Sequence, residues 1–362
     1  MAMVMKNQST RREFLKYSLS FAVGGATVAI LNPYIGIGDR ILDFLNPGLE
    51  KPFKKSFLSM GSFVDISIYD QQMKHLPYIM AKAEEEILAV DRLMSSFTEQ
   101  SDLAKVNRAA GYDRVAVDPR LCEVMASAKE IARRTDGVFD PTVLPLLKLY
   151  GLRDNAPRIP EHRRIEQALA LVDYRKIDVD PVKHQIGLEK QGASADLGGI
   201  AVGYAVDRAV AVLKAHGIQR AVINAGGEIY ALGTPKDQEG WQIGIQHPCI
   251  PNRLAGKVVI ADKAISTSGN YESKARDDNR HLGHLFDPKT GAMPDPMLSA
   301  TVIADTTMEA DAISTATFLM GAKNAIRFVE DQQNVDGAFL LAASARGGIE
   351  TIRSGGFPKI IG

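Results

Sequence analysis

The pattern of apolar and polar positions along the chain predicts both strands and helices. Over residues 57–69 apolar and polar residues loosely alternate, which is the period of a half-buried strand. Apolar positions over residues 78–94 recur at helical spacing, so a helix is expected there. Residues 119–134 predict a second helix, with Asp118 as its N-cap and Pro119 at its first position.

The second half of the chain continues this mixture. Residues 204–215, closed by Gly217, and residues 308–320, closed by Gly321, have the spacing of helices. Short apolar runs predict strands at 241–246, 256–260 and 298–303, and a pair of strands around a Gly-Gly turn at 220–233. Because strands and helices do not alternate strictly, the sequence predicts an α+β fold with mixed, largely antiparallel sheets and packed helices.

The first 45 residues differ from the rest and predict an export signal. Arg11 and Arg12 stand before Phe-Leu-Lys and a mild apolar segment at 17–37, a layout that resembles a twin-arginine signal peptide. A membrane-spanning helix is disfavoured, because glycine, asparagine and proline interrupt the segment and a span needs about 20 predominantly apolar residues. We expect a signal peptide or an uncleaved inner-membrane anchor at 1–45. The body at 46–362 would then reach the periplasm through the twin-arginine export machinery.

Composition and charge exclude several classes of protein. An apolar fraction of 45% is typical of a folded chain, and 43 Lys and Arg balance 43 Asp and Glu. Without a basic excess the chain is not expected to bind nucleic acid. Cys122 and Cys249 are its two cysteines, which excludes a disulfide scaffold and paired-cysteine zinc or iron–sulfur sites.

Familiar catalytic motifs are missing from the sequence. The glycines of residues 196–203 are in the wrong order for a dinucleotide fingerprint, and no G-x-x-x-x-G-K-[ST] occurs. There is also no H-E-x-x-H metal motif and no G-x-S-x-G nucleophile elbow.

Three polar or glycine-rich clusters remain as candidate sites. On a helix, Asp311, Ser314 and Thr315 would point to one side, and three oxygen donors suit Mg²⁺, although capping and ordinary surface polarity would also explain them. Residues 194–199 lead into a helix whose N-terminus can bind an anion, or they form a simple tight turn. Residues 136–142 predict a rigid loop, in which Asp140 either binds a ligand or caps the following turn.

These clusters, in order along the chain, resemble the bacterial flavin transferases of the ApbE type, which move FMN from FAD onto a protein. The similarity covers eight ordered blocks over about 260 residues, which together are specific although each alone is weak. The blocks are Met60-Gly61-Ser62, 95–107, 136–145, 196–207, 224–228, 265–269, 284–291 and 310–315.

The resemblance implies a role for individual residues of this chain. It implies an ApbE-like fold and a flavin site lined by Met60, Phe97, Val138, Phe139, Asp140, Asp196, Val202 and Phe286. It implies Mg²⁺ bound by the carbonyl of Gly199 and by Asp311, Ser314 and Thr315. Val202 stands where many relatives have lysine, and the position of Ser314 is commonly acidic in relatives. His284 matches a position proposed to help deprotonate the acceptor hydroxyl, and a solvent-exposed loop histidine is the alternative.

The implied reaction is a phosphoryl transfer. A Thr or Ser hydroxyl of an acceptor flavoprotein, such as a membrane electron-transfer subunit, attacks the FMN-side phosphorus of FAD, and AMP leaves. Asp311 is the expected catalytic metal ligand. The export signal is similar to that of the branch linked to nitrous oxide reduction. A FAD pyrophosphatase, a non-catalytic periplasmic flavin-binding protein and a general solute-binding protein are the alternatives. The metal hypothesis requires the turn at 196–199 to lie beside the start of the helix at 308–320.

Overall fold

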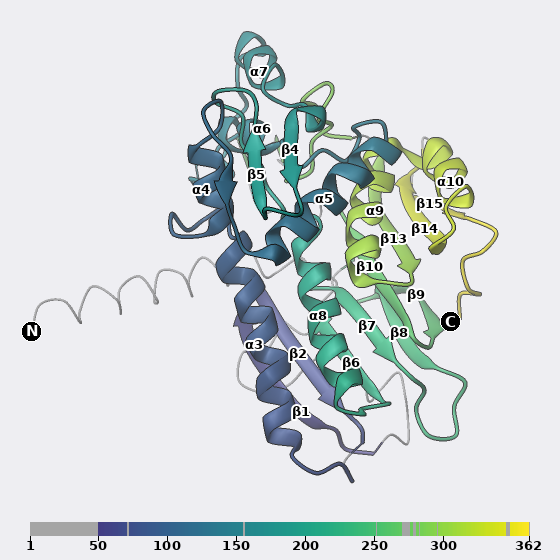
Figure 1. The fold of residues 1–362 in the computed structure, drawn as a ribbon. Helices are drawn as coiled ribbons and strands as arrows, with labels where there is room; N and C mark the ends of the chain where they lie inside the picture. The colour runs from purple at the N-terminus through teal and green to yellow at the C-terminus, as the bar shows by residue number, and fades with distance from the viewer. Residues whose placement is uncertain are drawn as a thin grey trace, which may run out of the picture.

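An antiparallel sheet forms the centre of the molecule (Figure 1). The structure is a computed structural model that describes residues 50–361 except 71, 155, 251, 270–275, 278–279, 282, 295 and 345–347. Within these residues eight strands form one sheet, and all neighbouring strands are antiparallel. In sheet order they are β1 (Phe53–Ser59), β2 (Ser62–Ile68), β6 (Ala221–Ala225), β7 (Glu228–Leu232), β10 (Lys263–Ser268), β13 (Met297–Ala304), β14 (Val335–Ala343) and β15 (Ile349–Arg353).

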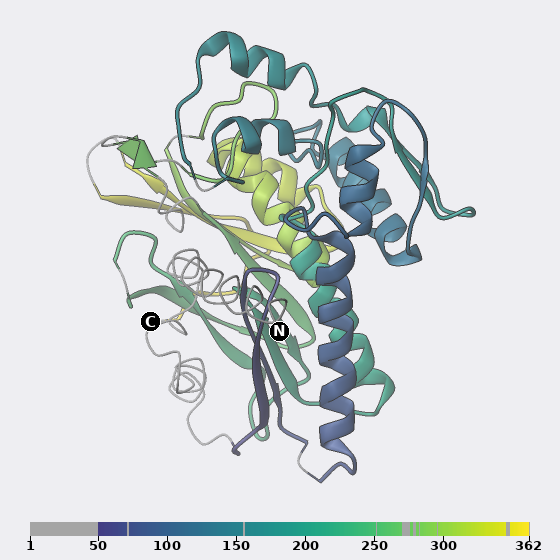
Figure 2. The same ribbon diagram turned by 90° about the vertical axis from the view of Figure 1, so that its left-hand side faces the viewer.

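Helices cover one face of this sheet, as Figures 1 and 2 show. Their apolar sides and the sheet enclose one large core, in which Ile87, Ala205 and Ile313 have no exposed surface. Such amphipathic packing, rather than intrinsic propensity, supplies most of the stability of helices in proteins. The covering helices are α3 (Leu76–Met94), α8 (Ala201–Ala215), α9 (Thr307–Met320) and α10 (Ala322–Glu330).

A two-stranded ribbon covers part of the opposite face. Strands β8 (Trp241–Gln246) and β9 (Leu254–Ile260) pair antiparallel and contribute to a second apolar cluster. Trp241 is fully buried in this cluster, and its ring centroid lies 4.8 Å from that of Tyr69. The inner strands of the central sheet therefore carry buried residues on both faces.

A smaller group of helices and short strands lies beyond one end of the covering helices (Figure 1). Loops from this group carry residues 96–97, 138–140 and 153 toward the candidate site. Its elements are α4 (Asp102–Arg108), β3 (Val115–Ala116), α5 (Pro119–Arg134), α6 (Leu144–Leu149), α7 (His162–Leu169), a 3₁₀ turn (Tyr174–Lys176), β4 (Ile177–Asp180) and β5 (Gln185–Leu188). A short hairpin, β11 (Arg276–Asp277) and β12 (Arg280–His281), completes the described elements.

Most of the predicted elements are present, and the α+β fold is confirmed. The predicted helix at 119–134 is α5, and Asp118 accepts a hydrogen bond from the backbone N–H of Arg120, 2.9 Å away. The single strand predicted at 57–69 is wrong, because the structure has a β1–β2 hairpin there. Met60 and Gly61 form the turn with φ of 52° and 76°. Two residues with positive φ form the turn that matches strand twist, but methionine gives no sequence signal for it.

The sequence patterns did not predict several other elements. Strands β10, β14 and β15 and helix α10 were not predicted. β14 reads as a nearly continuous apolar run, because it is buried on both faces and so lacks an alternating pattern. For such a run, sequence periodicity cannot separate a strand from a buried helix.

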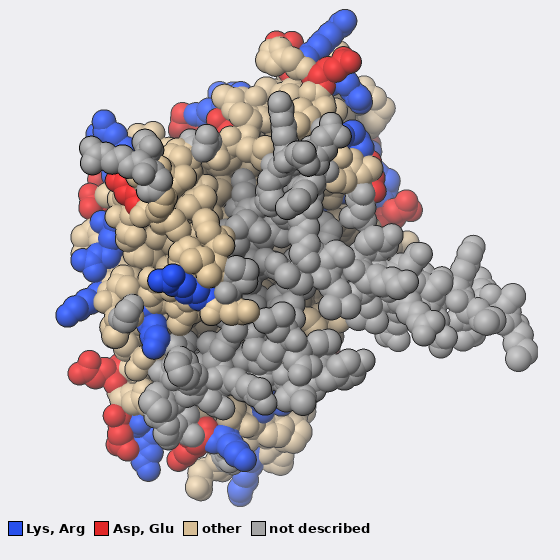
Figure 3. All heavy atoms as spheres, turned by 180° about the vertical axis from the view of Figure 1, so that it is seen from behind, with Lys and Arg blue, Asp and Glu red and all other residues tan. Residues whose placement is uncertain are grey.

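The export-signal prediction at residues 1–45 falls outside the described residues. No helix in the described part of the chain is both long and apolar enough to cross a bilayer. On the face shown in Figure 3, acidic and basic side chains are interspersed among the described residues. This distribution agrees with the zero formal charge of the sequence.

Candidate active site

The turn at 196–199 lies against the first turns of α9. The backbone N–H of Gly203 donates to Asp311 Oδ2 over 3.1 Å. A Cβ added to Gly199 would lie 3.2 Å from Thr315 Oγ1 and 3.5 Å from Phe139 Cε2. The two segments that the metal hypothesis requires to be neighbours are therefore in contact.

Helices α8 and α9 each bind the N-terminus of the other through a carboxylate. Asp311 of α9 accepts from Gly203, the third residue of α8. Asp207 of α8 accepts from the N–H groups of Thr307 and Met308, the first two residues of α9, over 2.7 and 2.8 Å. The first N–H groups of a helix lack partners within the helix and carry partial positive charge, so both contacts are favourable. This reciprocal arrangement sets the relative position of the two helices.

Burial raises the pKa values of both carboxyl groups. For Asp311, desolvation raises the pKa to about 7, the N–H of Gly203 opposes this, and the negative charge of Asp207 adds to it. Burial likewise raises the pKa of Asp207 above its usual value. A cation beside Asp311 would favour its charged form and lower its pKa.

Hydroxyl groups from β10 and α9 lie close to one another beside the backbone of Asp311. Ser314 Oγ lies 3.0 Å from Ser266 Oγ and 2.7 Å from Ser268 Oγ, and it donates to the carbonyl of Asp311 over 2.9 Å. Thr315 Oγ1 lies 3.2 Å from Ser268 Oγ. Ser266 and Ser268 were not predicted as site residues, because only the pairing of β10 beside β13 brings them next to α9.

The residues present fit a hard cation in their chemistry. Asp311 and Thr315, with the nearby backbone of Gly199, supply only oxygen atoms, which Mg²⁺ prefers. Ser314 fits less directly, since its proton and both lone pairs already have partners in Ser266, Ser268 and the Asp311 carbonyl. The described residues contain no group of three or more His, Cys, Asp or Glu side chains that could hold a metal. Any cation here would therefore depend on one carboxylate and neutral oxygens.

Asp196 is the centre of a second polar cluster. Its Oδ2 accepts from Ser96 Oγ over 2.6 Å and pairs with Arg153, and its Oδ1 accepts from the N–H of Gly198 over 3.0 Å. The Arg153 guanidinium carbon lies 4.3 Å from the centroid of the Phe97 ring. The structure thus brings the predicted residues Phe97 and Asp196 together. Arg153 and Ser96 were missed, because no local pattern signals an ion pair between distant segments.

The predicted loop at 138–140 also reaches this region. Phe139 is 5% exposed, and its ring edge lies beside Gly199. Asp140 accepts from Thr142 N, Thr142 Oγ1 and Tyr174 N over 2.8, 2.6 and 3.0 Å, and burial raises its pKa. These bonds order the loop, as the capping alternative for Asp140 predicts.

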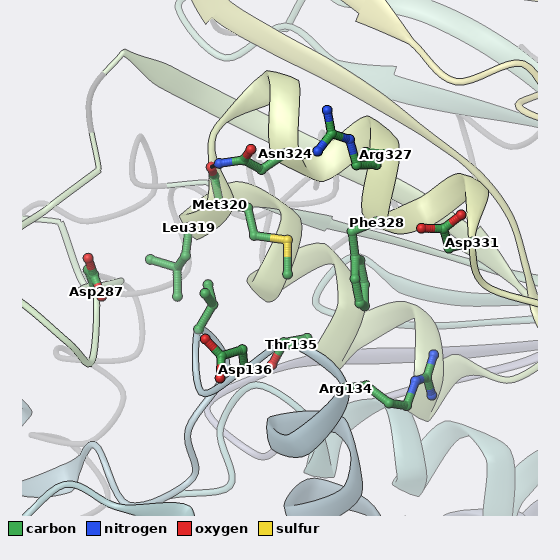
Figure 4. Close-up of a pocket in the computed structure, with 11 residues that line it drawn as sticks. Arg134, Thr135, Asp136, Asp287, Leu319, Met320, Asn324, Arg327, Phe328 and Asp331 are labelled. Atoms are coloured by element: carbon green, nitrogen blue, oxygen red, sulfur yellow. Dashed lines mark hydrogen bonds between the residues drawn. The ribbon is translucent and has the colours of Figure 1, made fainter.

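A cavity of about 500 Å³ opens beside this loop (Figure 4). Leu319, Met320 and Phe328 give it an apolar wall, and charged side chains surround them. Val138, predicted at the flavin site, and Asp287 also line it. The 136–139 loop therefore borders both the cavity, through Val138, and the Gly199 turn, through Phe139.

The remaining predicted residues lie in different surroundings. Met60 is in the β1–β2 turn, where its N–H donates to Asp91 Oδ2 over 2.9 Å. Val202 is partly buried and packs against the large core. Phe286 is 2% exposed, and its ring centroid lies 4.2 Å from that of Tyr150, so its side chain has little free surface for a ligand.

The imidazole of His284 is held in its neutral form. Desolvation by the surrounding protein, followed by the positive charge of Arg153, lowers its pKa to about 4. The residue is nevertheless exposed to solvent, as the alternative of an exposed loop histidine predicts. Arg153 thus connects His284 electrostatically to the Asp196 cluster.

Comparison with known proteins gives one consistent result. The model described as ApbE family matches residues 60–339. The chain is 27% identical over 292 residues to the FAD:protein FMN transferase of Klebsiella pneumoniae strain 342, covering 80% of this chain and 89% of that protein. It is 29% identical over 273 residues to that of Escherichia coli K12, covering 74% and 78%.

Solved structures agree with the sequence comparisons. The crystal structure of the ApbE protein of Thermotoga maritima has a TM-score of 0.76 and 29% identity, covering 84% of this chain and 97% of that one. The flavin transferase ApbE of Vibrio cholerae has the same TM-score at 24% identity, over 85% and 98% of the chains, which shows the fold.

Proposed function

Since the chain belongs to the ApbE family, with a match over residues 60–339, we propose that it transfers FMN from FAD to a Thr or Ser hydroxyl of an acceptor protein in a Mg²⁺-dependent reaction. The curated relatives are FAD:protein FMN transferases, so transferase activity with FAD as the flavin donor is the part with the widest support. The observation that carries the proposal is the contact between the Gly199 turn and the Asp311–Thr315 face of α9.

Different residues of the site would bind the metal, bind the flavin and accept the proton. Asp311, Thr315 and the carbonyl of Gly199 would hold Mg²⁺, joined by Ser314 if Ser266 and Ser268 reorient. When bound, Mg²⁺ would neutralise charge on the pyrophosphate and on the leaving AMP. Phe97 presents exposed aromatic surface beside Arg153 and Asp196, which suits an isoalloxazine ring. His284 is neutral at pH 7 and can accept the proton of the acceptor hydroxyl.

We also propose where the reaction takes place. The paired Arg11 and Arg12 and the apolar segment after them support export by the twin-arginine machinery to the periplasm. The acceptor would then be a flavoprotein with a domain in that compartment, such as a membrane electron-transfer subunit. Fractionation of cells that produce the wild type and an Arg11→Lys/Arg12→Lys variant tests this, because only the wild type should reach the periplasm.

One assay separates transfer from its alternatives. The full chain is incubated with FAD, MgCl₂ and a Thr-containing acceptor domain, with the acceptor's Thr→Val variant as control. Transfer gives flavin fluorescence on the denatured acceptor band and an equal amount of AMP, and the Thr→Val acceptor stays dark. A pyrophosphatase would release FMN and AMP without labelling either acceptor, and a binding protein would leave FAD intact.

The substitution Ser314→Asp is expected to lower the Mg²⁺ concentration needed for half-maximal activity by about tenfold. A second carboxylate at the cation adds a charge–charge attraction of a few kcal/mol, part of which is lost to repulsion with Asp311. A Mg²⁺ titration of the transfer rate measures this, with the uncharged Ser314→Asn as the matched control. An equal Mg²⁺ requirement in wild type and Ser314→Asp would remove Ser314 from the metal shell.

The dependence of the transfer rate on pH should reflect the lowered pKa of His284. Its pKa of about 4 means that the base form is present at all pH values well above 4, whereas an ordinary histidine loses half of it near 6.5. At saturating Mg²⁺, no loss of rate due to His284 is expected between pH 8 and about pH 6. His284→Ala should lower the rate about 10²-fold or more at every pH in this range. An acid limb near pH 6.5 that disappears in His284→Ala would contradict the lowered pKa.

A further inference from the structure

Arg153 has more hydrogen-bonding capacity than the described residues use. Its side chain is 20% exposed, and one terminal nitrogen pairs with Asp196. Its Nε atom is buried and has no hydrogen-bond partner, and within the described residues Nη1 has none either. Because an unsatisfied buried donor costs about 1–3 kcal/mol, an ion pair with Asp196 alone does not account for this arrangement.

The position of this guanidinium is defined by several chain segments. Arg153 follows α6, Phe97 follows α3, and Asp196 precedes α8. The guanidinium lies 4.3 Å from the centroid of the Phe97 ring, and its charge lowers the pKa of His284. A cation held over an aromatic ring and beside a carboxylate is preorganised, so little rotamer freedom is lost when a further partner binds.

The chemistry of the unused donors indicates their ligand. A guanidinium has five N–H donors in a planar fork that matches the oxygens of phosphate. Asp196 also places a negative charge next to the candidate metal site, and this charge would repel a phosphate unless a cation offsets it. Phe97 is 68% exposed although Arg153 contacts its ring, so the ring retains surface for a flat partner.

We propose that Arg153 is a substrate-binding residue that donates hydrogen bonds to phosphate oxygens of FAD, while Asp196 and Phe97 hold its guanidinium in place. This inference rests on the proposed function, in which FAD is the substrate. The positively charged side chain that would recognise phosphate then lies in the loop after α6, which no sequence motif identified.

The test measures FAD binding to the full chain by flavin fluorescence, without an acceptor, at about 0.01 M and about 1 M salt, where the Debye length falls from roughly 30 to roughly 3 Å. The wild type should bind FAD more weakly at high salt. Arg153→Gln should raise the Kd at low salt about tenfold or more and flatten the salt dependence. Arg153→Lys keeps the charge, so it should retain the salt dependence with a smaller loss of affinity.

Arg158→Gln is the matched control. Arg158 lies five residues further along the chain and forms an exposed ion pair with Asp154, with a 3.1 Å separation between Nη1 and Oδ2. Its replacement should change neither the Kd nor the salt dependence. The inference is overturned if Arg153→Gln binds FAD as the wild type does, or binds it more weakly with an unaltered salt dependence. A wild type that binds no FAD would instead overturn the proposed function itself, and with it this inference.

Discussion

Asp311→Ala is expected to reduce FMN transfer by about 10²- to 10⁴-fold. Asp311 is the one carboxylate among the oxygens that would hold Mg²⁺, and metal stabilisation of developing charge contributes several kcal/mol to such reactions. Since each 1.36 kcal/mol corresponds to a factor of ten in rate, a loss of this size follows. Rates of acceptor labelling at saturating FAD and Mg²⁺ measure it.

The Asp311→Ala variant should still fold, so its loss of activity can be attributed to the missing metal ligand and not to unfolding. Burial raises the pKa of Asp311 to about 7, above its value in an unfolded chain. Between these two pKa values the folded protein keeps a proton on Asp311 that the unfolded chain releases. The stabilisation from this proton is complete below the unfolded pKa near 4 and is lost as the pH rises through 7. At pH 8 the charged side chain therefore gives little net stability to the metal-free protein.

Asp311→Asn is the matched control for the structural contact. Its amide oxygen can still accept from the N–H of Gly203, but it lacks the charge. We expect the Asp311→Asn variant to be nearly as inactive as the Asp311→Ala variant. It should unfold at a denaturant concentration close to that of the wild type. Activity within about threefold of the wild type in either variant would contradict the metal assignment.

Gly203→Ala is expected to lower the free energy of unfolding by about 3 kcal/mol. A Cβ at this position would lie 2.3 Å from the carbonyl oxygen of Thr307 and 2.8 Å from the Cα of Met308. These are backbone atoms at the start of α9, so the two helices would have to move apart. The higher helix propensity of alanine, about 1 kcal/mol, offsets only part of this cost.

Separation of the helices should also impair the site. Asp311 would move away from Gly203, and the Gly199 turn away from Thr315, so FMN transfer should fall together with stability. Urea unfolding followed by circular dichroism measures the change in stability. Ala211→Ser, at an exposed position of the same helix, is the control and should stay within about 0.5 kcal/mol of the wild type. Equal stability of Gly203→Ala and wild type would show that the helices do not approach each other closely at Gly203.

Local patterns were sufficient to predict the fold class and many elements. Helix α5 could be predicted because Asp118, Pro119 and the apolar spacing lie within one stretch of 17 residues, 118–134. The turn between β6 and β7 could be predicted from its adjacent glycines, which tolerate positive φ. The β1–β2 turn could not, because the positive φ of Met60 is accompanied by a contact with Asp91, 31 residues away.

Motifs and caps involve residues close together in the chain, so the family, the fold class and the residue types at the candidate site could be predicted from sequence alone. How those residues meet depends on the tertiary structure. Asp311 binds the start of α8 across 108 residues, Asp207 binds the start of α9 across 100, and Arg153 reaches Asp196 across 43. Such pairings follow from strand order and helix packing, which bring distant segments together and leave no local periodicity from which to infer the contact.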